Sequence, residues 1–307
     1  MSSLKFQVSG FKLKDALCAF LTPDFKLQTS NFKLYSRGVS LVEMIVVIAI
    51  TGILAAGIAI FIRRPMEGYI DAARRAELTD LADTALRRMT RDVRTALPNS
   101  LRPTTSGNVH YLEYLQTGGG GRYRAEVAGD GSGNILDFTA ADASFDVIGL
   151  MPTLDAGNSI VVYNLNSDPA ITTSNAYVGD TRATYSSNTA TTITLTAATL
   201  FPFASPGKRF QVVQTPVTYA CDPLPGGIGD LRRVSGYAIQ AAQPNNINAG
   251  PLSTAPVNAL LARNVRACVF SYAVASQRTG ALALSLQLES GGESVRLFQQ
   301  VHVNNVP

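Results

Sequence analysis

The hydrophobic and polar residues of this chain fall into three successive patterns. Met44 to Ile62 is a run of nineteen residues without a charged side chain. From Met66 to Leu97, apolar residues recur at steps of three and four with charged residues between them, which predicts an amphipathic helix. Beyond residue 100, short β-rich runs are separated by Thr, Ser, Asn and Gly, which predicts strands and turns. The expected fold class is α+β, with a long N-terminal helix packed on a C-terminal antiparallel β-rich domain.

The uncharged run is long enough to cross a membrane. Val39 to Ile62 comprises 24 residues. At a rise of 1.5 Å per residue, a helix of this length extends about 36 Å, whereas the hydrocarbon core of a bilayer is about 30 Å thick. The one ionisable side chain of the segment Val39–Ile62 is Glu43, which stands just before the uncharged run. An unpaired carboxylate in lipid costs roughly 2–3 kcal/mol or more. We therefore expect a transmembrane segment in which Glu43 has a specific partner.

Three other interpretations of this run stay open. Leu54-Ala55-Ala56 resembles the small-residue site of a secretory signal, although the run is long and the segment before it is extended. A plain single-pass anchor would leave Glu43 unexplained. A buried core helix is disfavoured, because such segments usually have only about 10–14 apolar residues. Basic residues stand on both sides of the run, so charge alone barely orients it.

The second half of the helix has predicted limits. Pro65 follows two arginines, and because proline removes one backbone donor and disfavours helical geometry before it, a kink is expected there. Pro98 and Asn99 are expected to end the helix.

Nine segments beyond the helix are predicted to be strands, because β-branched and aromatic residues gather there. These are 109–115, 135–139, 159–164, 191–196, 209–220, 231–239, 265–274, 281–289 and 294–303. Thr117–Gly121 and Gly129–Asn134 are predicted to be turns. Leucines alternate with other residues in 281–288, which places them on one face of that strand.

The junction before the apolar run resembles a known processing signal. Arg37, Gly38, Val39, Leu41 and Glu43, followed by the uncharged run, are similar to the class III signal of type IV prepilins and pseudopilins. The resemblance implies that prepilin peptidase cleaves after Gly38 and methylates the new N-terminus at Val39. It also implies that Glu43 pairs with the amino terminus of a neighbouring subunit during assembly. The family most often has Phe at the first mature position, so Val39 departs from the pattern.

Two further segments carry a narrower resemblance. Arg91–Ser100 is similar to the helix end of minor pilins of the J/PilW type and of the MshO family, which serves biogenesis of the mannose-sensitive haemagglutinin (MSHA) pilus. Val295–Pro307 and Gly120–Arg124 also resemble the MshO family.

The resemblance implies four segments. They are a cleaved leader at 1–38, a transmembrane half-helix at 39–62, an amphipathic half-helix at 63–98 and a β-rich globular domain at 99–307. It also implies a minor pilin that takes part in assembly of a cell-surface pilus and in cell adhesion. The expected site is the inner membrane of a Gram-negative bacterium, with the β-domain in the periplasm before assembly. The expected partners are prepilin peptidase, the major and other minor pilins, and the pilus assembly platform.

The positive net charge belongs to the leader. The chain has 26 basic and 22 acidic residues, a formal charge of +4. Residues 1–38 contain five Lys and one Arg against Asp15 and Asp24, so their removal leaves 20 residues of each sign. A neutral mature chain lacks the electrostatic footprint of a nucleic-acid-binding protein, and no nucleic-acid partner is expected.

Cysteine usage follows the same boundary. Cys18 lies in the leader, which leaves Cys221 and Cys268 on the extracytoplasmic side, where thiols oxidise. We expect a disulfide between them. The alternative is two buried free thiols, since Cys268 lies in an apolar run.

Candidate chemistry for an enzyme is sparse, and no enzymatic activity, cofactor or metal is expected. The two histidines, His110 and His302, fall in predicted strands, and their separation from each other and from the cysteines does not match the spacing of metal ligands. Gly118–Gly121 lacks the Lys-Ser/Thr ending of a phosphate loop. Asp130–Asn134 places oxygen atoms at alternate positions, as a calcium loop does. Ala141 stands where such a loop has its bidentate glutamate, so a solvated turn is favoured.

Two matters stay open in the sequence. Phe-Lys-Leu recurs at 11–13, 25–27 and 32–34, and a short near-repeat of this kind is low-information sequence. We therefore expect translation to start nearer Arg37.

The function has two alternatives. One is a minor pseudopilin of a type II secretion system, and the other is a membrane-anchored β-domain that binds ligands or acts as an enzyme without polymerising.

Overall fold

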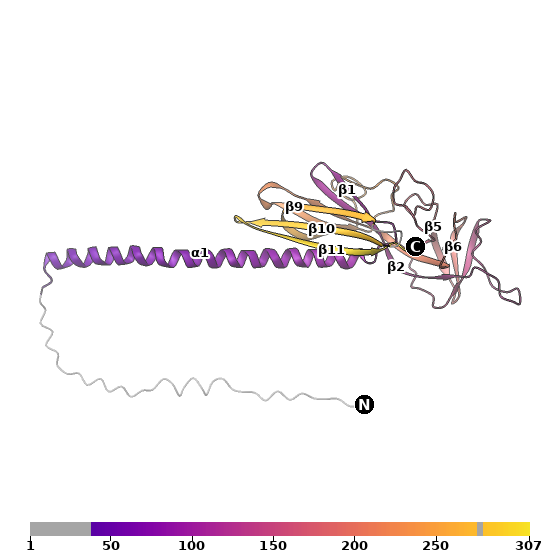
Figure 1. Cartoon of the computed structure of the whole chain (residues 1–307), viewed down its shortest axis with the longest axis horizontal. Helices are drawn as coiled ribbons and strands as arrows, with labels where there is room; N and C mark the ends of the chain where they lie inside the picture. Colours follow the sequence, from indigo (N-terminus) through magenta and orange to yellow (C-terminus); the bar gives the residue numbers. More distant parts are fainter. Residues whose placement is uncertain (1–37, 275–278) are drawn as a thin grey trace, which may run out of the picture. The chain divides into compact units, whose positions relative to one another are not determined.

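The computed structural model describes residues 38–274 and 279–307 (Figure 1). The expected leader before Gly38, with Cys18, lies outside the described residues. The chain divides between Ile62 and Arg63 into two units, and each is described by itself. Helix α1 (Leu41–Val93) runs through both units. The strands are β1 (Arg102–Ser106), β2 (Val109–Tyr123), β3 (Asp142–Ile148), β4 (Ser159–Val161), β5 (Arg182–Asn188), β6 (Thr192–Thr199), β7 (Arg209–Asp222), β8 (Gly229–Ser235), β9 (Val257–Val274), β10 (Thr279–Ser290) and β11 (Glu293–Asn304).

Helix α1 differs from its predicted limits at the C-terminal end. Pro65 lies inside the helix and does not end it, and the kink predicted there stays a prediction. The helix ends at Val93, before Pro98, because the next residues turn back toward the sheet. The Thr95 N–H donates to the Asp92 carbonyl at 2.9 Å, and the Leu97 N–H donates to Leu115 on β2 at 2.8 Å. Pairing with a strand therefore replaces the last turn of the predicted helix.

The strands form one antiparallel sheet with a closed part and an open part. Strands β2, β3, β6, β5, β4 and β7 follow one another, and β2 also pairs with β7, so these six strands close a ring. Strand β1 continues from β2, while β8, β9, β10 and β11 continue from β7. A short 3-10 helix, η1 (Pro225–Gly227), lies between β7 and β8 in the chain. This arrangement confirms the antiparallel β-rich domain, and its topology was not predictable from strand positions alone.

The apolar core has two main parts. The second half of α1 buries Leu78, Ala82, Leu86, Met89 and Val93 against the open part of the sheet. The leucines of β10 that alternate in sequence are buried on this same face, as predicted; they are Leu282, Leu284, Leu286 and Leu288. A separate cluster fills the ring, with Phe145 and Phe210 in edge-to-face contact at 5.4 Å between ring centroids. Burial of these large side chains supplies the main driving force for folding.

Several strand predictions were wrong. β1, β3 and β5 were missed, and 135–139 is irregular because its polar side chains satisfy local backbone donors instead of a ladder. The Asp137 carboxylate, for example, accepts a hydrogen bond from the Thr139 N–H at 2.7 Å. By contrast, the predicted turn at Gly129–Asn134 is confirmed by a hydrogen bond from the Gly131 N–H to Ala128 at 2.8 Å.

The glycine run at Gly118–Gly121 was predicted to be a turn, but it lies inside β2. Two register shifts interrupt the pairing of β2 with β7 beside it. A Cβ on Gly120 would lie 2.6 Å from the Phe210 carbonyl oxygen, and one on Gly121 would lie 2.8 Å from the Phe210 ring. Glycine is therefore needed here for the close approach of the two strands. The sequence alone does not distinguish this requirement from the glycine content of a turn.

Candidate functional site

The predicted processing site lies directly before α1. Gly38, Val39 and Ser40 are exposed and precede the first helical residue, Leu41. The Ser40 hydroxyl accepts a hydrogen bond from the Glu43 N–H at 3.2 Å, and its carbonyl accepts one from the Met44 N–H at 3.1 Å. Ser40 is thus the N-cap of α1. The spacing Ser-x-x-Glu is the sequence signal of such a cap, and it would have located the helix start.

The apolar run forms the first part of α1. Within the described residues, one helix is long and apolar enough to cross a membrane, at Leu41–Ile58, with a mean hydropathy of 2.5. Its side chains are exposed, including Ile48 at 64% and Ile53 at 73%. Thr51 is accommodated because its hydroxyl donates to the Val47 carbonyl at 2.7 Å, so this hydroxyl is satisfied within the helix. The segment has the properties of a helix that packs against lipid or other apolar helices.

Glu43 stands in the first turn of this helix, where the helix dipole favours a negative charge. Its side chain is exposed, and within the described part of the chain its carboxylate has no ion pair. The structure therefore supplies a well-positioned carboxylate on an apolar helix and, among the described residues, no partner for it.

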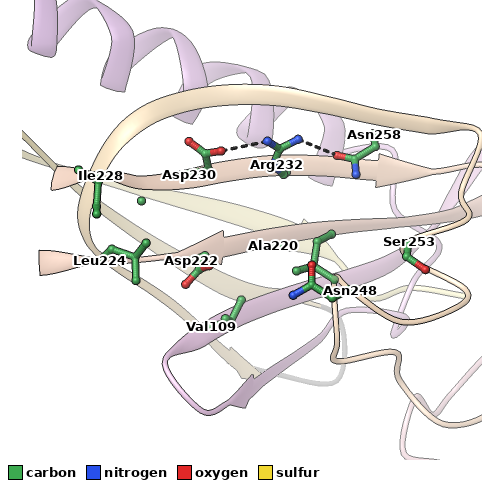
Figure 2. Close-up of a pocket in the computed structure, with 12 residues that line it drawn as sticks. Val109, Ala220, Asp222, Leu224, Ile228, Asp230, Arg232, Asn248, Ser253 and Asn258 are labelled. Atoms are coloured by element: carbon green, nitrogen blue, oxygen red, sulfur yellow. Dashed lines mark hydrogen bonds and ion pairs between the residues drawn. The ribbon is translucent and has the colours of Figure 1, made fainter.

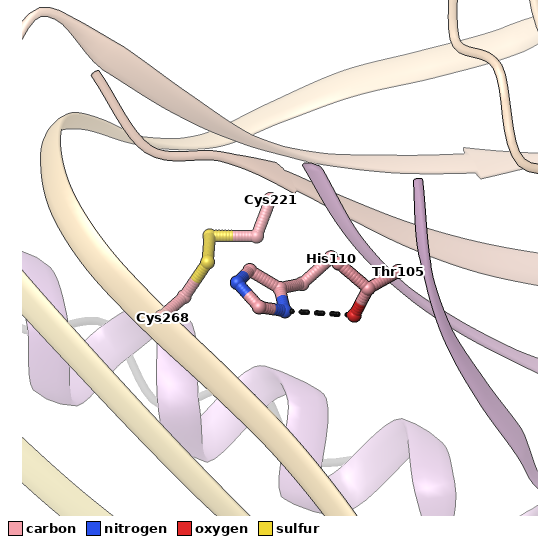
Figure 3. The surroundings of a disulfide bond; sticks show 4 residues. All are labelled: Thr105, His110, Cys221 and Cys268. Carbon is pink, nitrogen blue, oxygen red and sulfur yellow. Dashed lines mark hydrogen bonds between the residues drawn. A yellow bond between two sulfur atoms is a disulfide. The ribbon is translucent and has the colours of Figure 1, made fainter. Parts of the chain in front are cut away.

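The β-domain contains a disulfide between Cys221 on β7 and Cys268 on β9, as predicted, in place of two free thiols (Figure 3). The two Cα atoms are 6.6 Å apart, and both residues are buried. His110 on β2 pairs in register with Cys221, and its Nδ1 lies 3.1 Å from the Thr105 hydroxyl. His302 is exposed on β11, on the far side of the sheet from His110 in strand order. The structure does not bring the two histidines together.

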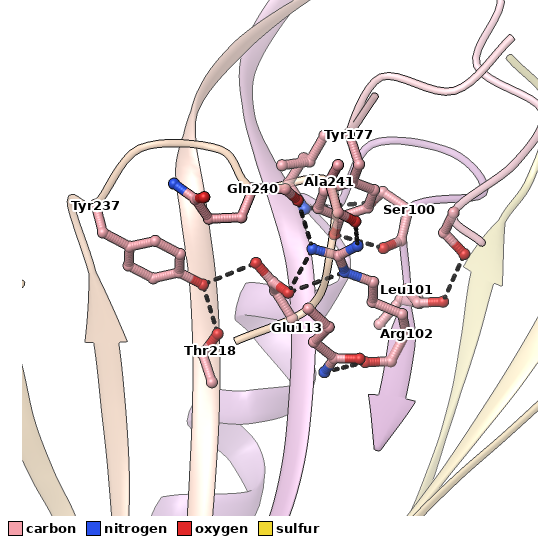
Figure 4. A network of polar contacts seen from close by, with 12 residues as sticks. Ser100, Leu101, Arg102, Glu113, Tyr177, Thr218, Tyr237, Gln240 and Ala241 are labelled. Atoms are coloured by element: carbon pink, nitrogen blue, oxygen red, sulfur yellow. Dashed lines mark hydrogen bonds and ion pairs between the residues drawn. The ribbon is translucent and has the colours of Figure 1, made fainter. Parts of the chain in front are cut away.

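A charged network lies inside the domain at the base of β1 (Figure 4). Arg102 contacts the Glu113 carboxylate at 2.9 Å, and both residues are buried. The Tyr237 hydroxyl donates to the other carboxylate oxygen at 2.9 Å, and Arg102 stacks 3.5 Å from the Tyr177 ring centroid. Burial raises the pKa of the Glu113 carboxyl, while Arg102 and Tyr237 lower it in part. Arg102 also donates to the carbonyls of Gln240 and Ala241, so the network ties the 237–243 segment to β1 and β2.

The network was missed in the sequence because its members are dispersed along the chain, and no spacing rule relates them. Its polar atoms are paired with one another. A buried group of this kind makes the packing specific.

A cavity of about 480 Å³ lies at the ends of β7 and β8 (Figure 2). Asp222 and Asp230 are directly opposite each other in the β7–β8 ladder. Asp230 pairs with Arg232 at 3.0 Å, and Arg232 donates to Asn258 at 3.4 Å. Apolar residues such as Leu224 and the polar residues Asn248 and Ser253 form the rest of the wall. The size suits a small ligand, but no histidine or cysteine is among its lining residues.

The oxygen-rich loop at Asp130–Asn134 forms a closed turn. The Asp130 carboxylate accepts hydrogen bonds from the Ser132 N–H at 2.9 Å and from its hydroxyl at 2.6 Å, and these bonds lower the pKa of Asp130. The Asn134 N–H donates to Asp146 at 2.9 Å. Across residues 38–274 and 279–307, no three His, Cys, Asp or Glu side chains gather as metal ligands would.

Comparison with known proteins agrees with the N-terminal geometry. Residues 33–59 match the prokaryotic N-terminal methylation motif. Comparison with curated proteins and with solved structures gave no match. The motif, the apolar helix and the antiparallel β-domain together support a protein of the type IV pilin class. The motif implies processing by prepilin peptidase and association with other pilins, and the apolar helix indicates membrane anchoring.

Proposed function

We propose that this protein is a minor pilin that takes part in assembly of a type IV pilus of the MSHA class. The observation that carries the proposal is the methylation motif at 33–59, which includes the apolar start of α1 and is followed by the rest of that helix and a large β-domain. In this proposal the precursor is inserted in the inner membrane of a Gram-negative bacterium, cleaved after Gly38 and methylated at Val39. The resemblance of Arg91–Ser100 and Val295–Pro307 to the MshO family supports the MSHA class.

Glu43 is the assembly contact in this proposal. It is the one acid on an apolar helix, and an unpaired carboxylate is strongly disfavoured in such surroundings. The new amino group at Val39 of a neighbouring subunit supplies a charge of the opposite sign. Because only one axial offset between two helices lets these groups meet, the pair sets the register between subunits.

The cysteine pair supports passage of the β-domain to the periplasm. Disulfides persist in oxidising compartments and are rare in the bacterial cytosol. The bond between Cys221 and Cys268 is therefore consistent with a domain that functions outside the inner membrane.

Intact-mass analysis and N-terminal sequencing of the membrane-extracted protein test the processing step. The expected mature chain begins at N-methylated Val39. Gly38→Val is expected to block cleavage, because the peptidase recognises the glycine before the cut. A membrane protein that keeps its residues before Val39 in a strain with active prepilin peptidase would contradict the proposal and favour a non-polymerising anchored domain.

Incorporation into pili tests the assembly role. Glu43→Ala is expected to be cleaved normally but to be absent from sheared pili. Asp71→Asn changes a partly exposed acid farther along α1 and is expected to be incorporated. Normal incorporation of Glu43→Ala would contradict the role of Glu43. Recovery of the wild-type chain only with secretion-system pseudopilins would identify a type II secretion pseudopilin instead.

A further inference from the structure

The exposed face of the second half of α1 carries a separation of charge. Its N-terminal portion presents Glu77, Asp80 and Asp83, and its C-terminal end presents Arg88, Arg91 and Arg94. We call these six residues the charged stripe. The opposite face of the same helix buries Leu78 and Met89 in the core, so the charged stripe points away from the sheet of its own chain.

The two halves of the charged stripe have the same spacing. Each acid precedes an arginine by eleven residues: Glu77 and Arg88, Asp80 and Arg91, Asp83 and Arg94. Eleven residues correspond to about three helical turns, so the two members of each pair project from the helix in nearly the same direction. Arg94 directly follows the last helical residue. The stripe is therefore complementary to a copy of itself displaced along the axis.

Most of these side chains lack a partner among the described residues of their own chain. Asp83 pairs with Arg87 at 2.6 Å. Across the described ranges, Glu77, Asp80 and the three arginines of the stripe make no ion pair or hydrogen bond through their side chains. Five of the six charges thus have no counter-charge within the described residues and remain available to a second molecule.

We propose that the charged stripe binds the charged stripe of a second copy of this chain, with the two helices parallel and displaced by eleven residues, about 16 Å. This offset brings each acid of one copy beside an arginine of the other. Without any offset, two parallel helices would place acid beside acid and arginine beside arginine, which is repulsive. The stripe therefore opposes side-by-side association at one depth in a membrane and favours a staggered array. The inference rests on the proposed function, because a staggered contact extends into a filament.

Charge reversal with mixing tests the complementarity. One variant of the full chain carries R88E, R91E and R94E, and the other carries E77K, D80K and D83K. In detergent at low salt, wild type is expected to self-associate in sedimentation velocity, and each variant alone is expected to lose about tenfold in association. An equimolar mixture of the two variants is expected to recover it. Raising the salt from about 0.05 M to about 0.5 M is expected to weaken both the wild-type and the mixed associations.

The contact is contradicted if the single variants associate as well as wild type, or if the mixture recovers nothing. Circular dichroism and thermal unfolding of each variant serve as controls for folding. Because the substituted positions are on the outer face of the helix, the variants are expected to fold. A variant that melts like wild type but does not associate has therefore lost the contact and not the fold.

Cysteine cross-linking tests the direction and the offset. Ala73 and Thr84 are exposed on the stripe side and are also eleven residues apart. In a C18S background, a mixture of A73C and T84C chains is expected to form an intermolecular disulfide. A72C, turned by about 100° from Ala73, is the matched control and is expected to cross-link poorly with T84C. Efficient T84C homodimers would indicate an antiparallel or unshifted contact and would overturn the proposed geometry.

The outcomes also separate this inference from the proposed function. If the precursor is cleaved after Gly38 and both charge-reversed variants enter pili at the wild-type level, the pilin function stands and the stripe contact is wrong. If the precursor is never cleaved, the pilin function fails even where the purified copies associate.

Discussion

The carboxylate of Asp92, in the last turn of α1, lies 2.8 Å from Nε of Arg233 on β8. The Tyr219 hydroxyl donates to the same carboxylate oxygen at 2.7 Å. A negative charge at a helix C-terminus is unfavourable by itself, because the helix dipole is negative there. Arg233 offsets this cost and joins the end of the helix to the sheet by a charge-assisted hydrogen bond. The helix and the sheet are thus connected by a specific polar contact in addition to their apolar core.

Replacing Arg233 with Met is expected to destabilise the β-domain by about 3 kcal/mol, because it leaves Asp92 mostly buried without its cation. Urea unfolding followed by circular dichroism measures this loss. Arg87→Met is the matched control: its pair with Asp83 is exposed, and its loss is expected to cost about 0.5 kcal/mol or less. Equal effects of the two changes would show that the Asp92–Arg233 contact is not special.

Removing the disulfide is expected to lower the free energy of unfolding by about 4 kcal/mol, from the entropy of the loop that it closes between Cys221 and Cys268, which are 47 positions apart. The double variant C221S/C268S and chemical reduction of wild type should give the same denaturation midpoint. A reducing agent should then have no further effect on the double variant. A midpoint unchanged by either treatment would argue against the bond in the folded protein.

Gly229→Ala is expected to be among the most damaging single-methyl additions. A Cβ at this position would collide with the Asp222 carbonyl oxygen and would lie 2.6 Å from that of Val265. Because both obstacles are backbone atoms of neighbouring strands, the loss is expected to exceed about 3 kcal/mol. Gly129→Ala, with open space around the added carbon, is expected to change the melting temperature little. Similar melting temperatures for the two variants would contradict the close strand approach.

Asp146 is expected to make the protein acid-sensitive. Hydrogen bonds from the Asn134 N–H and the Thr192 hydroxyl, with the charge of Arg124, lower the pKa of Asp146 below its ordinary value. Its stabilising contribution is therefore fully present above the unfolded pKa of about 4 and is lost as the pH falls through the lower folded pKa.

Thermal unfolding from pH 6 down to about pH 2 tests this expectation. Asp146→Asn is expected to be less stable than wild type at pH 6 and to lose less stability on acidification. Asp155→Asn, in a turn without such contacts to its side chain, is the comparison. If the melting temperatures of wild type and Asp146→Asn fall in parallel as the pH is lowered, Asp146 does not cause the acid sensitivity.

The parts of the fold that the sequence predicted correctly depend on local patterns. The amphipathic half of α1 was recognised because Leu78, Ala82 and Met89 recur on one face, and the buried leucines of β10 were recognised by their alternation. Segments with weak local signals were missed. Strand β5 consists mostly of Ser, Thr, Ala and Asn, and it is a strand because β4 and β6 supply its hydrogen-bond partners.

The candidate site shows the same division. Gly38, Val39 and Glu43 could be proposed as site residues from the sequence because they lie in one contiguous motif, which the match at residues 33–59 covers. Arg102 and Glu113 were not found, although they are buried together, because neither residue type predicts burial. The eleven-residue spacing of acids and arginines along α1 can be seen in the sequence. Only the structure shows that the other face of the helix is buried, so that the charged stripe faces outward.

The sequence by itself determined the N-terminal methylation motif, the apolar helix and the amphipathic helix that continues it, because each depends on residues adjacent in the chain. Only the tertiary structure decided the six-stranded ring, the glycine run inside β2 and the contact between Asp92 and Arg233. These features join residues far apart in the chain; Asp92 and Arg233 are separated by 141 positions. Their partners are selected by the global packing of the sheet, which no local pattern of hydrophobic and polar residues encodes.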